Sequence, residues 1–124
     1  MAVRVADRGE GMTSLDRTLA ALAEPTRRRA VDLLRKSPRR AGELAEAIGV
    51  SAPLMSRHLR TLRLEGIVEE AHGDPRDSRI RMYHLRREPF DELGGWLRQV
   101  EALWEDQLAS FRDHVERTEK GRRR

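Results

Sequence analysis

The amino-acid sequence predicts a mainly α-helical domain that carries one β-hairpin. Apolar residues recur at every third or fourth position over most of the chain, which is the spacing of amphipathic helices. After Gly66 the period shortens towards two, and turn-forming residues divide that region, as is typical of two strands joined in a hairpin. The 124 residues fit one small domain, whose thin core favours association with a second copy.

The N-terminal region is expected to hold a short arm and then a helix. Residues 1–13 show no helical period and are interpreted as a flexible arm, within which Met12 is an alternative start to Met1. The following segment, SLDRTLAALAE, offers Ser14 as an N-cap. Its apolar face consists of Leu15, Leu19 and Leu22.

The next two helices are predicted from a proline and a glycine. Pro25 suits the first turn of a helix, so PTRRRAVDLLRKS is expected to be helical and to end near Ser37. RAGELAEAIGV predicts a third helix, which Gly49 ends in the left-handed conformation. The residues expected to face inward are Ala30, Val31, Leu33 and Leu34 on the second helix and Leu44, Ala45 and Ile48 on the third.

A fourth helix is expected over residues 52–65, with Ser51 as its N-cap. Together with the third helix and the short turn at Gly49, it indicates a helix-turn-helix. Met55, Leu59 and Leu62 fall on one side of it. The opposite side carries Pro53, Ser56, Arg57, Arg60, Thr61 and Leu64, with Leu54 at the margin.

Two strands, IVEEAH and RIRMYHL, are predicted around the turn segment GDPRDS. The inward set of the second strand stays open, because its apolar residues divide between the two faces. A helix-turn-helix followed by a hairpin is a winged helix, so we expect a DNA-binding domain over residues 14–87 with a wing tip at 73–79.

A long final helix is predicted over residues 88–118, followed by a disordered basic tail at 119–124. Its apolar stripe is longer than one winged domain can cover, so we expect the first and last helices to form a dimer interface, with an intramolecular core as the alternative. The predicted interface residues are Leu15, Leu19, Leu22, Leu93, Leu97, Val100, Trp104, Leu108 and Phe111.

Charge is unevenly distributed along the chain. Residues 25–63 hold ten Lys/Arg and three Asp/Glu, a net charge of +7, whereas residues 88–119 hold three Lys/Arg and nine Asp/Glu, a net charge of −6. The basic region is typical of a surface that faces a polyanion and the acidic region is not, although a plain solvated surface is the alternative.

Composition and motifs argue against several classes of protein. The chain has no cysteine, which excludes disulfides and thiolate chemistry and fits a cytoplasmic protein. It shows neither a transmembrane run nor a secretory signal, so no membrane partner is expected. Catalytic motifs are absent and the histidines lack metal-ligand spacing, so we expect no enzyme and no cofactor, though an intersubunit metal site at His114 stays open.

Three phrases, LAEPTRRRAVDLL, GELAEAIGVSAPLMSRHLRTLRLEGIV and RMYHL, resemble the ArsR-type winged-helix transcriptional regulators over about residues 13–118. The resemblance implies a homodimer that binds an inverted-repeat operator in double-stranded DNA and represses transcription until a signal releases it. It also implies DNA contacts from Ser51, Ser56, Arg57 and Arg60 on the fourth helix and from Arg76 and Arg79 on the wing.

The sequence departs from the family pattern at three places. Arg40 stands where a hydroxyl cap for the third helix is common, and Leu54 stands where a small or polar residue is common. The thiolate pair of the metal-sensing members is missing, and His114 and Glu116 are two residues apart, which points them away from each other on a helix.

The residues themselves support phosphate contacts by Arg27, Arg28, Arg57, Arg60, Arg76 and Arg79. Arg57 is the strongest candidate for reading a base, because an arginine can form a bidentate contact with guanine. Ser56 and Leu54 are weaker candidates, and the leucine is equally well an exposed apolar side chain.

Two other functions stay open from the sequence. The domain could be an interaction module that binds an acidic protein or RNA, or a metal-responsive sensor. The operator, the regulated genes, the inducer, and the choice between activation and repression do not follow from the residues.

Overall fold

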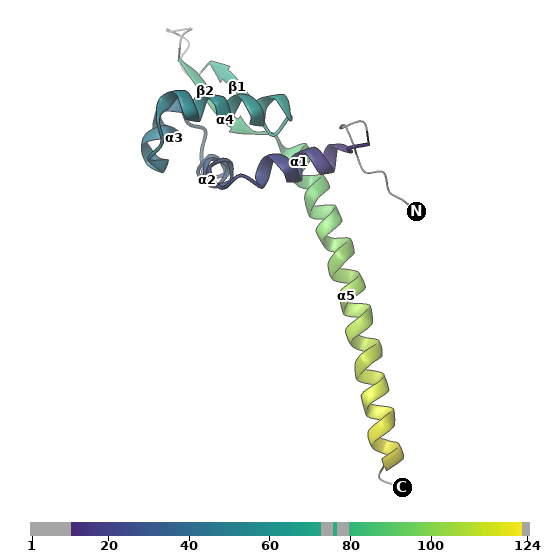
Figure 1. Ribbon diagram of the computed structural model, residues 1–124. Helices are drawn as coiled ribbons and strands as arrows, with labels where there is room; N and C mark the ends of the chain where they lie inside the picture. Colours follow the sequence, from purple (N-terminus) through teal and green to yellow (C-terminus); the bar gives the residue numbers. More distant parts are fainter. Residues whose placement is uncertain (1–10, 73–75, 77–79, 123–124) are drawn as a thin grey trace. The chain divides into compact units, whose positions relative to one another are not determined.

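The computed structural model describes residues 11–72, 76 and 80–122, and its elements follow the predicted order (Figure 1). They are α1 (Ser14–Leu22), α2 (Pro25–Leu34), α3 (Ala41–Ile48), α4 (Ala52–Leu64), β1 (Val68–His72), β2 (Arg81–Leu85) and α5 (Arg87–Arg122). The chain divides into two compact units, Met1–Asp91 and Glu92–Arg124. Among the described helices, none combines the length and the apolar character that a membrane crossing requires.

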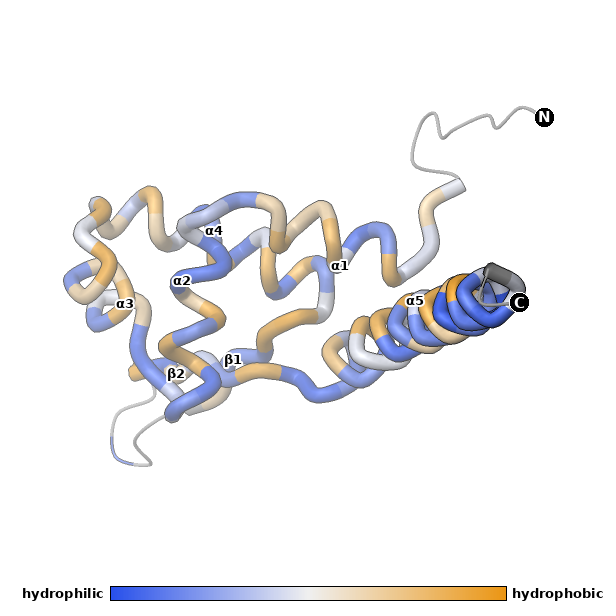
Figure 2. The backbone as a smooth tube through the Cα atoms, turned by 90° about the horizontal axis from the view of Figure 1, so that it is seen from below, coloured by the Kyte–Doolittle hydropathy of each residue, from blue (hydrophilic) through white to orange (hydrophobic). Residues whose placement is uncertain are grey.

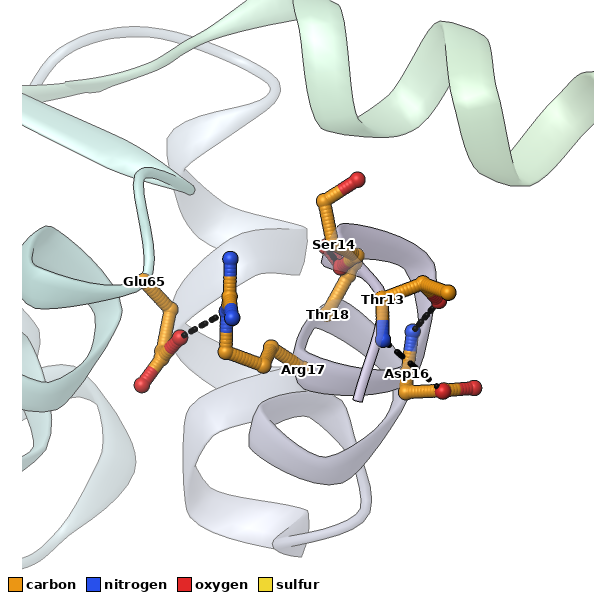
Figure 3. A network of polar contacts seen from close by, with 6 residues as sticks. All are labelled: Thr13, Ser14, Asp16, Arg17, Thr18 and Glu65. Atoms are coloured by element: carbon orange, nitrogen blue, oxygen red, sulfur yellow. Dashed lines mark hydrogen bonds and ion pairs between the residues drawn. The ribbon is translucent and has the colours of Figure 1, made fainter. Parts of the chain in front are cut away.

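The N-cap of helix α1 (Ser14–Leu22) lies one residue before the predicted one. Thr13, not Ser14, is the N-cap: its Oγ1 accepts from the Asp16 N–H at 3.1 Å, and its own N–H donates to Asp16 Oδ2 at 3.0 Å (Figure 3). Both side chains therefore satisfy backbone groups that a helix end leaves unpaired. Thr13 thus belongs to the helix start and not to the arm predicted over residues 1–13, of which residues 1–10 lie outside the described chain.

The turns of the helix-turn-helix follow the predicted caps. Gly49 has φ 86°, and its N–H donates to the Ala45 carbonyl at 2.8 Å, which ends α3. Ser51 Oγ accepts from the Leu54 N–H at 3.2 Å and caps α4. Arg40 begins α3 without a hydroxyl cap, because its N–H donates to Glu43 Oε1 at 2.8 Å.

Helix α4 ends in a glycine motif that leads directly into β1. Gly66 has φ 75°, its N–H donates to the Arg63 carbonyl at 3.0 Å, and the Ile67 N–H donates to the Leu62 carbonyl at 2.9 Å. This pair of hydrogen bonds is the Schellman arrangement, which requires a left-handed residue. Ile67 is fully buried, so the motif also fixes where the hairpin leaves the core.

Strands β1 and β2 form an antiparallel pair in which Val68 lies opposite Leu85 and Glu70 lies opposite Tyr83. Because side chains alternate between the faces of a strand, Arg81, Tyr83 and Leu85 share one face. Tyr83 and Leu85 pack against the core, which resolves the inward set of the second strand. A backbone bridge between Arg39 and Tyr83 joins the segment before α3 to the hairpin.

The core of the first unit is built by α1 to α4 and β1. The fourth helix buries the predicted stripe of Met55, Leu59 and Leu62. The other buried apolar residues are Ala21, Ala30, Leu34, Leu44, Ala45, Ile67 and Val68. Each residue of α2 and α3 that was predicted to face inward either belongs to this buried set or packs against it.

The apolar face of α1 differs from the prediction. Thr18 and Ala21 are its buried residues, while Leu19 is 37% exposed. Thr18 can be buried because its hydroxyl donates to the Ser14 carbonyl at 3.0 Å, which satisfies the polar group. The face turned to the core is therefore shifted from the leucine stripe, and much of Leu19 is left uncovered.

The second unit is the continuation of α5 from Glu92. Figure 2 shows hydrophobic and hydrophilic positions alternating along this helix. The helix extends to Arg122, so the prediction of a disordered tail from 119 is wrong for residues 119–122. Basic residues at a helix C-terminus interact favourably with the unpaired carbonyls, which supports this extension.

Candidate nucleic-acid interface

The outward side of α4 presents the residues predicted to contact DNA. Ser51, Ser56, Arg57 and Arg60 are exposed, and Leu54 is half-buried. The buried stripe of Met55, Leu59 and Leu62 holds the opposite side of the helix in the core. Sequence periodicity therefore predicted the exposed side correctly, because it follows from the same 3.6-residue repeat.

Arg57 and Arg60 keep their hydrogen-bond donors available. Within the part of the chain that the structure describes, no ion pair or hydrogen bond engages either guanidinium. A guanidinium carries five N–H donors and stays charged at any physiological pH. This side of α4 can therefore offer two fully charged, multidentate groups to an anionic ligand.

Arg27 and Arg28 lie in the first turn of α2, next to the end of α1. Arg27 Nε donates to the Ala21 carbonyl at 2.6 Å, and its Nη1 lies 3.2 Å from Nδ1 of His58. Arg28 Nη1 donates to the carbonyls of Leu22 at 2.7 Å and Ala23 at 3.0 Å. Both arginines therefore pair carbonyl groups at the end of α1, which leaves them fewer donors for a phosphate.

The wing is described only in part. Arg76 is exposed in the turn between the strands. Arg79 and most of the predicted tip at 73–79 lie outside the described residues. Their expected contacts with DNA remain predictions.

A charged cluster that sequence reasoning missed lies between α4 and the hairpin. Oε1 of Glu70 accepts hydrogen bonds from Nη1 of Arg63 and Nη1 of Arg81, each at 2.9 Å. The Glu70 side chain is 16% exposed, compared with 45% for Arg63 and 53% for Arg81. The strand register and the packing of the hairpin on α4 bring these residues together, since Glu70 shares the face of β1 that carries the buried Val68.

The protonation of this cluster follows from its neighbours. Partial burial alone would raise the pKa of Glu70, but the hydrogen bond with Tyr83 and the charges of Arg81 and Arg63 outweigh it and lower that pKa. Burial, together with Glu70, raises the pKa of the Tyr83 hydroxyl. Glu70 is therefore a carboxylate and Tyr83 a neutral phenol at neutral pH.

Two further contacts hold the C-terminal end of α4. Arg17 Nε on α1 lies 3.4 Å from Oε1 of Glu65, the C-cap residue of α4 (Figure 3). Arg86 Nη1 donates to the Gly66 carbonyl at 2.9 Å. These contacts connect α4 to the first helix and to the end of the hairpin, so its exposed side is held by several elements.

The described residues contain no group of three or more His, Asp or Glu side chains arranged to hold a metal ion. His58 lies against Arg27, and His84 Nε2 lies 3.6 Å from Oε2 of Glu69.

The residues predicted to form a dimer interface differ in exposure. Leu15, Leu22, Leu93 and Val100 are half-buried, whereas Leu19, Leu97, Trp104, Leu108 and Phe111 are exposed.

Comparisons with known proteins agree with this geometry. Residues 24–70 match the model of the bacterial regulatory proteins of the arsR family. The transcriptional repressor SdpR of Bacillus subtilis (strain 168) is 28% identical over 83 residues, which are 67% of this chain and 88% of that protein. An HTH-type transcriptional regulator of Mycobacterium tuberculosis is 44% identical over 55 residues, which are 44% of this chain and 51% of that protein.

The crystal structure of an ArsR family transcriptional regulator has a TM-score of 0.64 and 28% identity, and the match covers 75% of this chain and 98% of that chain. These comparisons confirm the winged helix-turn-helix fold and the ArsR-type resemblance. The relatives are transcriptional regulators, which confirms the prediction that the chain is not an enzyme.

Proposed function

We propose that the chain is a transcriptional regulator of the ArsR type, because its residues 24–70 match the model of that family, and that it acts as a homodimeric repressor of an inverted-repeat operator. Helix α4 reads the major groove, and the wing contacts the neighbouring DNA. In a symmetric dimer the two reading helices then lie about 34 Å apart, one turn of DNA.

The exposed side of α4 is the observation that carries this proposal. This side carries Ser56, Arg57 and Arg60. The opposite side of the helix packs in the core through fully buried residues. Neither arginine has an intramolecular ion pair within the described chain, so binding DNA breaks no existing salt bridge at these positions. Arg57 is proposed to contact a guanine, which discriminates by about 1–3 kcal/mol against a wrong base.

The exposed apolar side chains of α5 support the dimer. Trp104 is 63% exposed, Leu108 61% and Phe111 66%. Together with Leu93, Leu97, Val100 and Val115 they repeat after eleven residues, a period that keeps one stripe along a nearly straight helix. A stripe of this kind in water is stabilised by pairing with the same stripe of a second copy. Leu19 of α1, which is also exposed, is proposed as part of the same interface.

Repression, rather than activation, is proposed because the curated relative matched over 88% of its own length is named a repressor. A dimer of this size that occupies an operator can block a promoter by its presence alone. The signal that releases the repressor is proposed to act by lowering its affinity for DNA.

Selection of bound sequences from a random duplex pool, at about 0.15 M salt where the Debye length is about 8 Å, tests this function. Enrichment of one inverted repeat is the expected result, with a specificity ratio of about 10³ or more over random DNA. A pool that stays random would contradict the proposal and favour a module that binds an acidic protein or RNA. A change of affinity on adding zinc or a chelator would instead favour a metal-responsive sensor.

A further inference from the structure

The cluster around Glu70 holds two arginines on one carboxylate oxygen. Arg63 on α4 and Arg81 on β2 both donate through Nη1 to the same oxygen, Oε1 of Glu70, at 2.9 Å. Their nitrogen atoms therefore lie within two hydrogen-bond lengths of each other. Like charges at this separation repel, so the carboxylate between them is required to keep the pair together.

The cluster nevertheless retains positive charge. Glu70 offsets one of the two guanidinium charges, and no other described acidic residue forms an ion pair with Arg63 or Arg81. Each guanidinium donates to Glu70 through Nη1 and has further N–H groups, while roughly half of each side chain stays exposed. The carboxylate is covered and the donors around it are open to solvent.

A pocket of about 200 Å³ lies at this cluster. Its walls include Ser56 and Arg60 of α4 in addition to Arg63, Glu70, Arg81 and Tyr83. Arg60 adds a third guanidinium without an acidic partner among the described residues. The pocket therefore combines three cations with one anion and is continuous with the side of α4 assigned to DNA.

We propose that this pocket is a binding site for one phosphate group, and that Glu70 is a positioning residue that holds Arg63 and Arg81 in place to bind it. Two neighbouring guanidinium groups can donate parallel hydrogen bonds to the oxygens of one phosphate. The phosphate is either a phosphodiester of the DNA backbone or a free phosphoryl group. If the phosphate belongs to DNA, the inference rests on the proposed function. It then adds Arg63 and Arg81 to the residues proposed to contact DNA.

Glu70→Gln tests the positioning role through the sign of its effect. The substitution keeps the side-chain shape but removes a negative charge, so attraction by net charge alone would tighten binding to DNA. Positioning has the opposite result, because an uncharged amide no longer offsets the repulsion between the two arginines. We expect binding to weaken about tenfold, and the slope of log K against log salt to fall in magnitude by about 0.9, the loss of one phosphate contact.

Glu69→Gln is the matched control. Glu69 precedes Glu70 on β1, and its carboxylate faces His84 and Arg86 at 3.6 Å and 3.7 Å, away from the pocket. It makes the same change of charge and is expected to leave binding unchanged or slightly tighter. Arg81→Gln should reproduce the change in salt slope, and thermal unfolding of all three full-length variants identifies any that fail to fold.

Inorganic phosphate, added against chloride at equal ionic strength, distinguishes the two sources of the phosphate group. The readout is the NMR signals of the arginine Nε–H groups in wild type and in Arg81→Gln. A saturable shift of the Arg63 and Arg81 signals by phosphate in wild type, with no shift of the Arg63 signal in the variant, supports a site open to free phosphate. A shift caused by duplex DNA alone supports the phosphodiester.

Absence of both shifts, or a Glu70→Gln variant that binds DNA as tightly as Glu69→Gln, would overturn the proposal. If wild type still binds DNA specifically in that case, only the pocket is wrong and the proposed function stands. If wild type binds no DNA, the proposed function is wrong, and the phosphate titration alone decides the pocket.

Discussion

Nη1 of Arg27 lies 3.2 Å from Nδ1 of His58, and this contact joins α2 to the helix that carries the proposed DNA-reading residues. The same guanidinium donates through Nε to the Ala21 carbonyl at the end of α1 at 2.6 Å. One arginine thus connects three helices, although the charge pattern of the sequence marked it as a phosphate contact.

Arg27→Ala is expected to lower the free energy of unfolding by about 1–2 kcal/mol, because it leaves a part-buried carbonyl unpaired and removes the contact with His58. Urea unfolding followed by circular dichroism measures the change. Arg29→Ala is the control, since Arg29 is exposed two residues further along the same helix and should change stability little. Equal stabilities with weaker DNA binding only in Arg27→Ala would instead assign Arg27 to the phosphate backbone.

Gly66→Ala is expected to destabilise the protein by about 1 kcal/mol or more. The residue has φ 75°, where a side chain is strained, and a Cβ there would lie 2.9 Å from Arg86 Nη1. Gly42→Ala is the matched control, because Gly42 lies within α3 and an added Cβ meets no atom within 4 Å. Its stability should stay equal or rise by up to about 1 kcal/mol. A similar response of both variants in thermal unfolding would contradict the strain at Gly66.

Arg57→Ala is expected to weaken binding to the selected operator by about 10- to 100-fold and to change binding to random DNA much less, because a base contact discriminates by about 1–3 kcal/mol. Fluorescence anisotropy with both duplexes at one salt concentration measures the ratio. Arg35→Ala is the control with the same change of charge, since the one ion pair of Arg35 among the described residues is with Asp32 of α2 at 3.9 Å. An equal loss on both DNAs would reduce Arg57 to a phosphate contact.

Trp104→Glu is expected to shift the protein from dimer to monomer, because it places a charge in the middle of the exposed α5 stripe. Sedimentation velocity over a range of concentrations measures the dissociation. Ser110→Glu, which adds the same charge outside the stripe, should leave the dimer intact. Wild type that sediments as a monomer at all concentrations would remove the dimer from the proposed function.

Stability should fall in acid in a manner that depends on Glu70. The pKa of its carboxyl group is lower in the folded chain than the ordinary value of 4.5, so the folded state binds fewer protons than the unfolded one. Its stabilisation is therefore complete above the unfolded pKa and is lost as the pH falls through the folded pKa. Wild type should lose more unfolding free energy between pH 7 and acid pH than Glu70→Gln, and Glu69→Gln should behave as wild type. Parallel curves for wild type and Glu70→Gln would contradict this role.

Local patterns in the sequence were sufficient for most of the elements. Gly49 and Ser51 define the turn of the helix-turn-helix through a left-handed residue and a cap, which depend only on neighbouring residues. The buried stripe of α4 follows from helical periodicity, and with it the exposed side that carries Arg57 and Arg60. Local patterns also predicted the hairpin, although they did not predict which face of its second strand turns inward.

Tertiary structure decided which charged residues are free and which are engaged. Sequence could not assign Arg27 and Arg28 to the end of α1, because the unpaired carbonyls there come within reach of the two guanidinium groups only through the way α2 follows α1 in the fold. The same holds for Glu70, which meets Arg63 and Arg81 only through the register of the hairpin and its packing on α4. Charge along a chain is a local property, whereas pairing of charges depends on distances that only the folded backbone establishes.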